Sequence, residues 1–426
     1  MTSRERVLTA LNHRAPDHVP IDFGATTVSG MHATCVAALR DYLGLERRLV
    51  KVYEPSQFLG WIDDDLKQVL GIDTEPVVPR KANYGMVLDT WKPYRTYQGL
   101  EVLVPANFNV TIDRNGDTLM HPGGDTSIPP SGRMPAGGYF FDAIIRQKEF
   151  KEEDLDPADN VEEYGLYSDD DLNYLETCAR QAAATGRAVV GKFGSGFGDI
   201  ATIPGVSLAN PKGIRDVAEW YMSISSRRDY VDEVFSRQCD IMLENLRRLH
   251  ARVGGLIDVA YLCGTDFGTQ TSTFCSLRTF RDLWFPCYKR VNDWVHANTG
   301  WKTFKHSCGS VVRFIDSFIE CGFDILNPVQ ISATGMEPET LKSTYGDRLV
   351  FWGGGVDTQQ TLPFASPTEV RDQVRRHCEI FARNGGYVFN TVHNVQAQTP
   401  VENIVAMIGA VHEFQGKPGP LAATLR

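Results

Sequence analysis

The chain has 426 residues, of which 42% are hydrophobic and 23% charged, and its formal net charge is −10. These values are ordinary for a globular enzyme, and the negative charge argues against non-specific binding to nucleic acid. No apolar run approaches the roughly 20 residues that span a bilayer, and no signal peptide opens the chain. Nine scattered cysteines without paired spacing indicate a reducing compartment, so we expect a cytoplasmic protein with no membrane partner.

The first third of the chain begins with helix and strand signals and then becomes β-rich. Residues 1–6 carry the pattern of a helix cap and first turn, residues 19–23 a short strand, and residues 33–43 a helix. Alternating segments at 99–105 and 108–112 predict strands, and Asn115-Gly116 predicts a hairpin turn. We interpret residues 76–145 as a β-rich insertion that caps the active-site mouth of one domain spanning residues 1–426.

From about residue 170, short apolar runs alternate with helical stretches. This alternation implies parallel strands, and with the strand at 19–23 and one further strand that the pattern does not locate it predicts a closed (β/α)8 barrel. A doubly wound open sheet is the alternative. No G-x-G-x-x-G motif follows the first strand, which disfavours a dinucleotide-binding fold. The apolar runs are residues 188–193, 256–261, 302–306, 323–327, 349–353 and 387–390.

Polar residues concentrate where these predicted strands end, at residues 258–270, 306–309, 353–359 and 390–396. In (β/α)8 barrels the functional groups sit at the carboxyl ends of strands. Asp266 is a candidate metal ligand, base or substrate contact, with a loop cap as the alternative role. Asp357 is a candidate substrate contact that alternatively caps a helix or braces a loop. The expected substrate-binding residues are Asp22, Gln270, Asn327, Asp357 and Asn390.

His306 and Cys308 stand two residues apart at the end of one apolar run, and His393 follows a later one. Imidazole and thiolate are both good zinc ligands. If the two strand ends are neighbours, three ligands converge and a fourth position stays open, which is the pattern of a catalytic metal site. The alternatives are a hydrogen-bonded core histidine for His393 and an inert buried thiol for Cys308.

Several segments, in this order, are similar to the uroporphyrinogen decarboxylase superfamily, and the chain resembles the cobalamin-dependent methyltransferases within it. The resemblance implies a (β/α)8 barrel. In that branch it also implies zinc bound by a His-x-Cys pair and by a later cysteine before a Thr-Pro-x-Glu-Asn segment. His306 and Cys308 match the pair, whereas His393 stands at the position of the later cysteine, six residues before Thr399. The similar segments are residues 4–13, 16–22, 264–270, 306–309, 322–328, 354–357 and 399–403.

The implied activity is a zinc-dependent methyl transfer between a small methylated molecule and a corrinoid (cobalamin) on a partner protein, with Asp266 and His306 as catalytic residues. Demethylation is the preferred direction. The alternatives are a metal-free decarboxylase or lyase of a small carboxylic acid, and a non-catalytic component of a methyl-transfer system. Whether the chain forms a homo-oligomer stays open.

Two further features bear on the substrate. Porphyrinogen decarboxylases carry an arginine-rich segment after the first strand, whereas residues 22–30 contain no arginine, so a substrate with many carboxylates is not expected. Aromatic residues of the insertion either line a pocket for an aromatic methyl ether or pack the cap onto the barrel. They are Tyr84, Trp91, Tyr94, Tyr97, Tyr139, Phe140 and Phe141.

Overall fold

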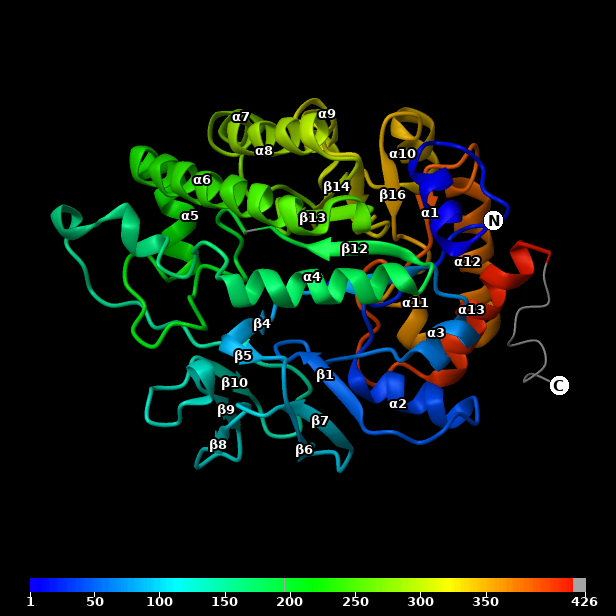
Figure 1. Ribbon diagram of the computed structural model, residues 1–426, viewed down its shortest axis with the longest axis horizontal. Coiled ribbons are helices and arrows are strands. Elements are labelled where there is room, and N and C mark those ends of the chain that lie inside the picture. Colours follow the sequence, from blue (N-terminus) through cyan, green and yellow to red (C-terminus); the bar gives the residue numbers. More distant parts are fainter. Residues whose placement is uncertain (195, 417–426) are drawn as a thin grey trace.

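The computed structural model describes residues 1–194 and 196–416 and is built around a parallel sheet with helices on its outside (Figure 1). The strand order is β17-β16-β15-β14-β13-β12-β3, and each neighbouring pair is parallel. This arrangement confirms the predicted α/β barrel class. The strands are β3 (Thr74–Val77), β12 (Ala188–Lys192), β13 (Val259–Cys263), β14 (Lys302–His306), β15 (Ile325–Asn327), β16 (Val350–Trp352) and β17 (Tyr387–Val388).

The two edges of this sheet are joined by residues 20–22, which lie between β17 and β3. Phe389 donates its backbone N–H to the carbonyl of Pro20, and Asp22 donates to the carbonyl of Phe389. On the other side, Asp73 donates to the carbonyl of Ile21. The expected strand at 19–23 is therefore a short bridging segment, and β3 is the strand that the sequence pattern did not locate.

The helices begin and end at recognisable signals. Thr2 and Glu5 form the expected capping box of α1, and Ser366 and Glu369 form another at the start of α12. The predicted helix at 33–43 is α2. The helices are α1 (Ser3–Leu11), α2 (Ala33–Tyr42), α3 (Asp64–Leu70), α4 (Asp169–Ala184), α5 (Val217–Ser226), α6 (Arg228–Val253), α7 (Leu277–Leu283), α8 (Phe285–Asn298), α9 (Ile315–Glu320), α10 (Pro338–Tyr345), α11 (Thr361–Phe364), α12 (Pro367–Phe381) and α13 (Val401–Phe414).

Short strands between the first helices and α4 form a separate layer beside the barrel (Figure 1). One sheet has the order β2-β1-β7-β6 and another β11-β10-β9-β8, while β4 and β5 pair alone. The predicted turn at Asn115-Gly116 joins β8 to β9, and Gly116 has a φ of 84° that suits glycine. These strands are β1 (Val50–Glu54), β2 (Leu59–Gly60), β4 (Lys81–Ala82), β5 (Met86–Val87), β6 (Trp91–Arg95), β7 (Glu101–Pro105), β8 (Val110–Ile112), β9 (Thr118–Met120), β10 (Gly132–Met134) and β11 (Asp142–Ala143).

The bounds of this layer differ from the expected 76–145. Residue 76 falls inside the barrel strand β3, and the layer also takes in β1 and β2, which precede it in the chain. The reason is that β1 pairs in parallel with β7, so a segment close to α2 completes the cap sheet. The expected boundary rested on local alternation, which does not show which strands pair.

Alternate side chains of the barrel strands fill the barrel interior. Ala188 and Val190 of β12, Val259 and Tyr261 of β13, and Phe304 of β14 belong to one buried cluster. Because successive side chains of a strand point to opposite faces, the next residue of the same parity also points inward. Lys192 and His306 have that parity, and each is the last residue of its strand.

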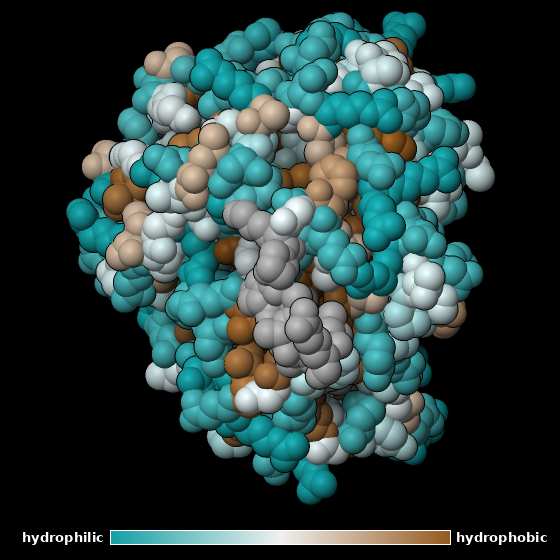
Figure 2. Space-filling view, turned by 90° about the vertical axis from the view of Figure 1, so that its right-hand side faces the viewer, coloured by the Kyte–Doolittle hydropathy of each residue, from teal (hydrophilic) through white to brown (hydrophobic). Residues whose placement is uncertain are grey.

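The outside of the molecule is largely hydrophilic on the face shown in Figure 2. Among the helices that the structure describes, none is both long enough and apolar enough to cross a bilayer.

Candidate metal centre

His306 ends β14 at the carboxyl end of the barrel, and its ring is held in one tautomer. Its Nδ1 lies 2.6 Å from Oδ1 of Asn327, and the Nδ2 group of Asn327 donates to the carbonyl of Trp352 at 2.8 Å. The second contact fixes the Asn327 amide, so Oδ1 is the acceptor and His306 Nδ1 carries the proton. The lone pair on Nε2 can therefore accept a hydrogen bond or, once the neighbouring thiol is deprotonated, bind a metal. Burial lowers the His306 pKa to about 3, so the ring is neutral near pH 7.

Cys308 lies beside the free nitrogen of His306. Its Sγ is 3.4 Å from His306 Nε2, and its backbone N–H donates to Oδ1 of Asp266 at 2.7 Å. The same carboxylate oxygen lies 3.8 Å from His306 Nε2. Burial and the charge of Asp266 raise the pKa of the Cys308 thiol well above its ordinary value. A cation bound at Sγ would reverse this shift, because it stabilises the thiolate.

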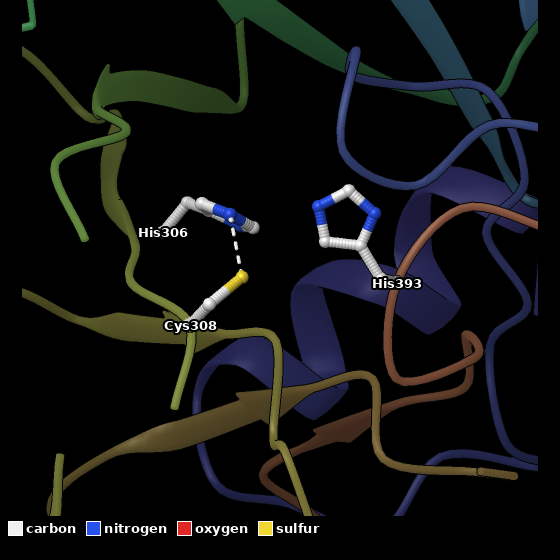
Figure 3. Close-up of side chains that lie close together, drawn as sticks. All are labelled: His306, Cys308 and His393. Carbon is white, nitrogen blue, oxygen red and sulfur yellow. Dashed lines mark hydrogen bonds between the residues drawn. The ribbon is translucent and has the colours of Figure 1, made fainter. Parts of the chain in front are cut away.

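His393 faces this pair from a loop that follows β17. Its ring centre lies 5.4 Å from that of His306, at an interplanar angle of 74°. Burial lowers the His393 pKa to about 4. The backbone N–H of Asn394 donates to His393 Nδ1 at 2.8 Å, so in the neutral ring the proton is on Nε2. Nε2 is the nitrogen that points toward His306 and Cys308 (Figure 3).

The three side chains converge as the sequence predicted they would if their strand ends were neighbours. One ligand atom from each of His306, Cys308 and His393 lies within 4.8 Å of the others. Zinc bonds of about 2.0–2.3 Å place tetrahedral ligands roughly 3.3–3.8 Å apart, so the donor set fits zinc after small side-chain movements. For His393 Nε2 to bind a metal, its proton must leave or move to Nδ1, which would break the bond from Asn394.

A cavity of about 290 Å³ opens beside the three side chains. His306, His393 and Asp266 line one side of it, and Asp199 and Lys192 line another. Burial, together with the charge of Asp266, raises the pKa of Asp199 to about 7. A substantial fraction of Asp199 is therefore a neutral carboxylic acid at neutral pH, able to donate a proton inside the cavity.

None of the five expected substrate-binding residues lines this cavity. Asp22 and Asn390 are fully buried: Asp22 accepts from Thr74 and Trp352, and Asn390 donates to the Asp22 and Ser29 carbonyls. Asn327 supports the His306 ring. Gln270 bonds to Gln330, Ser332 and Gln359, and Asp357 braces its own loop by accepting from the backbone of Gln359 and Gln360. Asp357 lines a different cavity. A direct contact between any of the five and a substrate remains a prediction.

Two other expectations are altered by the tertiary structure. Asp258, grouped with the carboxyl-end residues 258–270, precedes β13 and so lies at the opposite end of the barrel, where Arg4 pairs with it at 3.0 Å. The seven aromatic residues of the insertion do not line the cavity. Tyr94 and Phe141 instead contact Phe108 in the core of the cap, which favours the packing role.

Lys192 and Asp199 line the cavity although the sequence pattern did not single them out. The available signal was the alternation of β12, which turns Lys192 to the same face as Ala188 and Val190. No comparable local signal marks Asp199, because it lies in a loop whose path the chain periodicity does not predict.

Residues 207–414, which include His306, Cys308 and His393, match the family model described as uroporphyrinogen decarboxylase (URO-D). This match covers just under half of the chain, so over these residues the chain is similar to the uroporphyrinogen decarboxylase superfamily. It is 29% identical over 102 residues to the uroporphyrinogen decarboxylase of Methylococcus capsulatus, covering 24% of this chain and 27% of that protein. It is 40% identical over 57 residues to that of Ralstonia nicotianae, covering 13% of this chain and 16% of that protein. These matches span less than a third of each relative's length.

A methyltransferase from Methanosarcina mazei has a similar structure over almost the whole length of both chains. The TM-score is 0.54, the sequence identity is 14%, and the alignment covers 97% of this chain and 99% of the other. At this identity the likeness establishes a common fold, so the cap and the barrel both belong to it.

Proposed function

We propose that this protein is a member of the uroporphyrinogen decarboxylase superfamily and acts as a zinc-dependent, corrinoid-linked methyltransferase. It would move a methyl group between a small methylated substrate in the barrel cavity and a corrinoid held by a partner protein. The observation that carries the proposal is the convergence of His306, Cys308 and His393 within 4.8 Å at the edge of that cavity. The fold shared with the Methanosarcina mazei methyltransferase supports it.

His306 Nε2, Cys308 Sγ and His393 would hold the zinc. When bound, zinc acts as a Lewis acid that lowers the pKa of a coordinated thiol or makes an ether oxygen a better leaving group. Asn327 keeps the His306 ring in the ligand-ready tautomer. Asp266 holds the backbone of Cys308 in place and contributes negative charge beside the ligands.

Asp199 would supply the proton that demethylation requires. Removing a methyl group from an ether leaves an alkoxide or phenoxide oxygen, which must be protonated before it leaves the site. Asp199 lines the cavity and has a pKa of about 7, so it can give a proton and recover it from water near neutral pH.

Metal analysis of purified protein tests the proposal directly. We expect about one zinc per chain, and we expect His306→Ala and Cys308→Ser to lose the zinc and the methyl-transfer activity together. Cys275→Ser is the matched control, since Cys275 is a half-buried thiol distant in sequence from the ligands. Protein without zinc whose activity survives His306→Ala would refute the proposal.

A metal-free decarboxylase of a small carboxylic acid is the second candidate, favoured by the curated relatives, which are uroporphyrinogen decarboxylases. It predicts release of carbon dioxide and activity that is indifferent to chelators. A porphyrinogen is disfavoured as the substrate in either case. Lys192 is the only lysine or arginine among the described residues that line the cavity, whereas a substrate with many carboxylates needs several cations.

A further inference from the structure

We propose that Lys192 binds a carboxylate of the substrate, so that the molecule in the cavity is a small methylated acid with a single carboxylate at this end. This inference deepens the proposed function and rests on it for the methyl group. The carboxylate itself is inferred from the residues of the cavity alone.

Lys192 is placed inside the barrel mouth by the strand that carries it. It is the last residue of β12 and has the same parity as Ala188 and Val190, which point into the barrel core. Its side chain continues that inward row into the cavity, which Asp266 and His306 also line. An ammonium group at this position is placed to contact a molecule bound in the cavity.

The ammonium of Lys192 has no ionic partner among the residues that the structure describes. Its Nζ donates to Oγ1 of Thr27 at 3.2 Å, and among the described residues no carboxylate oxygen lies within 4.0 Å of it. A neutral hydroxyl satisfies only one of its three donors. Two other cations near the barrel, Arg6 and Lys67, pair with Asp73 and Glu75. The buried Lys305 of β14 has no carboxylate partner among the described residues, but its ammonium donates to the carbonyls of Thr265 and His306 and to Sγ of Cys263.

The acidic residues of the cavity lie too far from the Lys192 ammonium to pair with it, and each accepts at least one hydrogen bond from another group. Glu54 accepts the backbone N–H groups of Ser56 and Gln57 and the amide of Asn83. Asp199 accepts from the backbone of Ala201. Within the described residues, the cavity therefore offers one ammonium with a single hydrogen bond beside carboxylates that already accept hydrogen bonds.

Without a bound anion, burial of the Lys192 ammonium is energetically unfavourable. It lowers the pKa of Lys192, and the charges of Glu54 and Asp199 only partly oppose the effect. A carboxylate bound against the ammonium would raise that pKa again and use the remaining donors. The position is thus suited to an anion that arrives with the substrate.

The distance from Lys192 to the metal ligands limits the length of the substrate. Lys192 lies level with Tyr261, and Tyr261 with Phe304, in neighbouring parallel strands. Two strand spacings correspond to about 10 Å, and His306 stands one inward position beyond Phe304. Because this is a spacing between backbones and both side chains extend inward from them, the space left between the ammonium and the ligands is shorter. A small molecule with a carboxylate at one end and a methyl ether or thioether at the other suits it, and a cavity of about 290 Å³ admits only a small molecule.

Binding of matched probes to the zinc-containing protein tests the inference. The probes are methoxyacetate and 4-methoxybenzoate, each compared by calorimetry with its uncharged amide. We expect at least one acid to bind the wild-type protein about 10- to 100-fold more tightly than its amide, the gain of a charge-assisted contact. Lys192→Met should abolish this preference, and Lys192→Arg, which keeps the charge, should retain part of it.

Two outcomes would overturn the inference: neither acid binding the wild-type protein more tightly than its amide, or the preference persisting in Lys192→Met. The first comparison uses only wild-type protein, so it holds even if Lys192→Met does not fold. His306→Ala separates this inference from the proposed function. A variant that loses zinc but still prefers the acid supports carboxylate binding at Lys192 independently of the metal, whereas wild-type protein that prefers the acid and contains no zinc refutes only the methyltransferase.

Discussion

The two ends of the barrel differ in whether their charged groups are paired within the protein. At the amino end, three aspartates immediately precede strands and each is paired: Asp73 with Arg6, Asp258 with Arg4, and Asp324 with Lys302. At the carboxyl end, His306, His393 and Lys192 line one cavity and Cys308 lies beside the two histidines, while Lys192 has no carboxylate partner there among the described residues.

The amino-end aspartates follow one rule. Each accepts the backbone N–H of a residue in the neighbouring strand position: Asp73 from Ile21, Asp258 from Val189 and Asp324 from Thr303. Every such carboxylate therefore joins two adjacent strands and neutralises a cation. Groups that are satisfied inside the protein stabilise the fold, whereas groups with unused donors or lone pairs remain for a ligand.

This contrast predicts that changes at the amino end alter stability without altering zinc binding. Asp73→Ala should have the largest effect on stability, because among the described residues it leaves the buried guanidinium of Arg6 with Asp17 as its one ionic partner and Ile21 without its acceptor. We expect the free energy of unfolding to fall by about 3 kcal/mol in denaturant titrations. Zinc content of the folded variant should match the wild type; a loss of zinc would contradict the separation of the two ends.

Substitutions at the carboxyl end should alter zinc binding without altering stability, and His393 gives the first example. His393→Ala is expected to weaken zinc binding by at least about 100-fold, since a ligand is lost, while the unfolding free energy of the metal-free protein changes by less than about 1 kcal/mol. His393→Cys supplies the ligand that the resemblance implies and should restore binding. Competition with a chromophoric chelator measures the zinc affinity of both variants. Unchanged zinc affinity in His393→Ala would show that His393 serves instead as a hydrogen-bond donor, as the contact from Asn394 to Nδ1 favours.

A smaller effect is expected from the support of His306. Asn327→Leu removes the acceptor that holds the proton on His306 Nδ1, and we expect zinc affinity to fall about 10- to 100-fold. Asn327→Asp keeps an acceptor at the same place and should lose less. Equal losses in the two variants would mean that Asn327 acts through general packing and not through the tautomer.

The smallest effect concerns acid stability at the amino end. Hydrogen bonds from His296 and the Thr303 backbone, with the charge of Lys302, hold the pKa of Asp324 below its usual value of 3.8. A carboxylate with a lowered pKa adds stability above its unfolded pKa and loses that stability as the pH falls through the folded value. Asp324→Asn should therefore cost about 1 kcal/mol at pH 7 and flatten the decline in stability below about pH 4, with zinc content unchanged at pH 7. An unaltered decline on acid titration would contradict this role.

The sequence by itself determined the barrel class, the capped helices, the hairpin at Asn115-Gly116 and the pairing of His306 with Cys308. These follow from signals within a few residues: strand alternation, capping boxes and a two-residue ligand spacing. Only the tertiary structure decided that residues 20–22 join β17 to β3, that Asp258 lies at the far end from Asp266, and that His393 faces the His306 pair. Each depends on which strands are neighbours and on which end of a short strand a residue stands, and neither is encoded in local periodicity. Lys192 depends on both kinds of information. Strand alternation in the sequence predicts that its side chain points into the barrel, but only the folded structure shows that its ammonium lies in a cavity and has no carboxylate partner among the described residues.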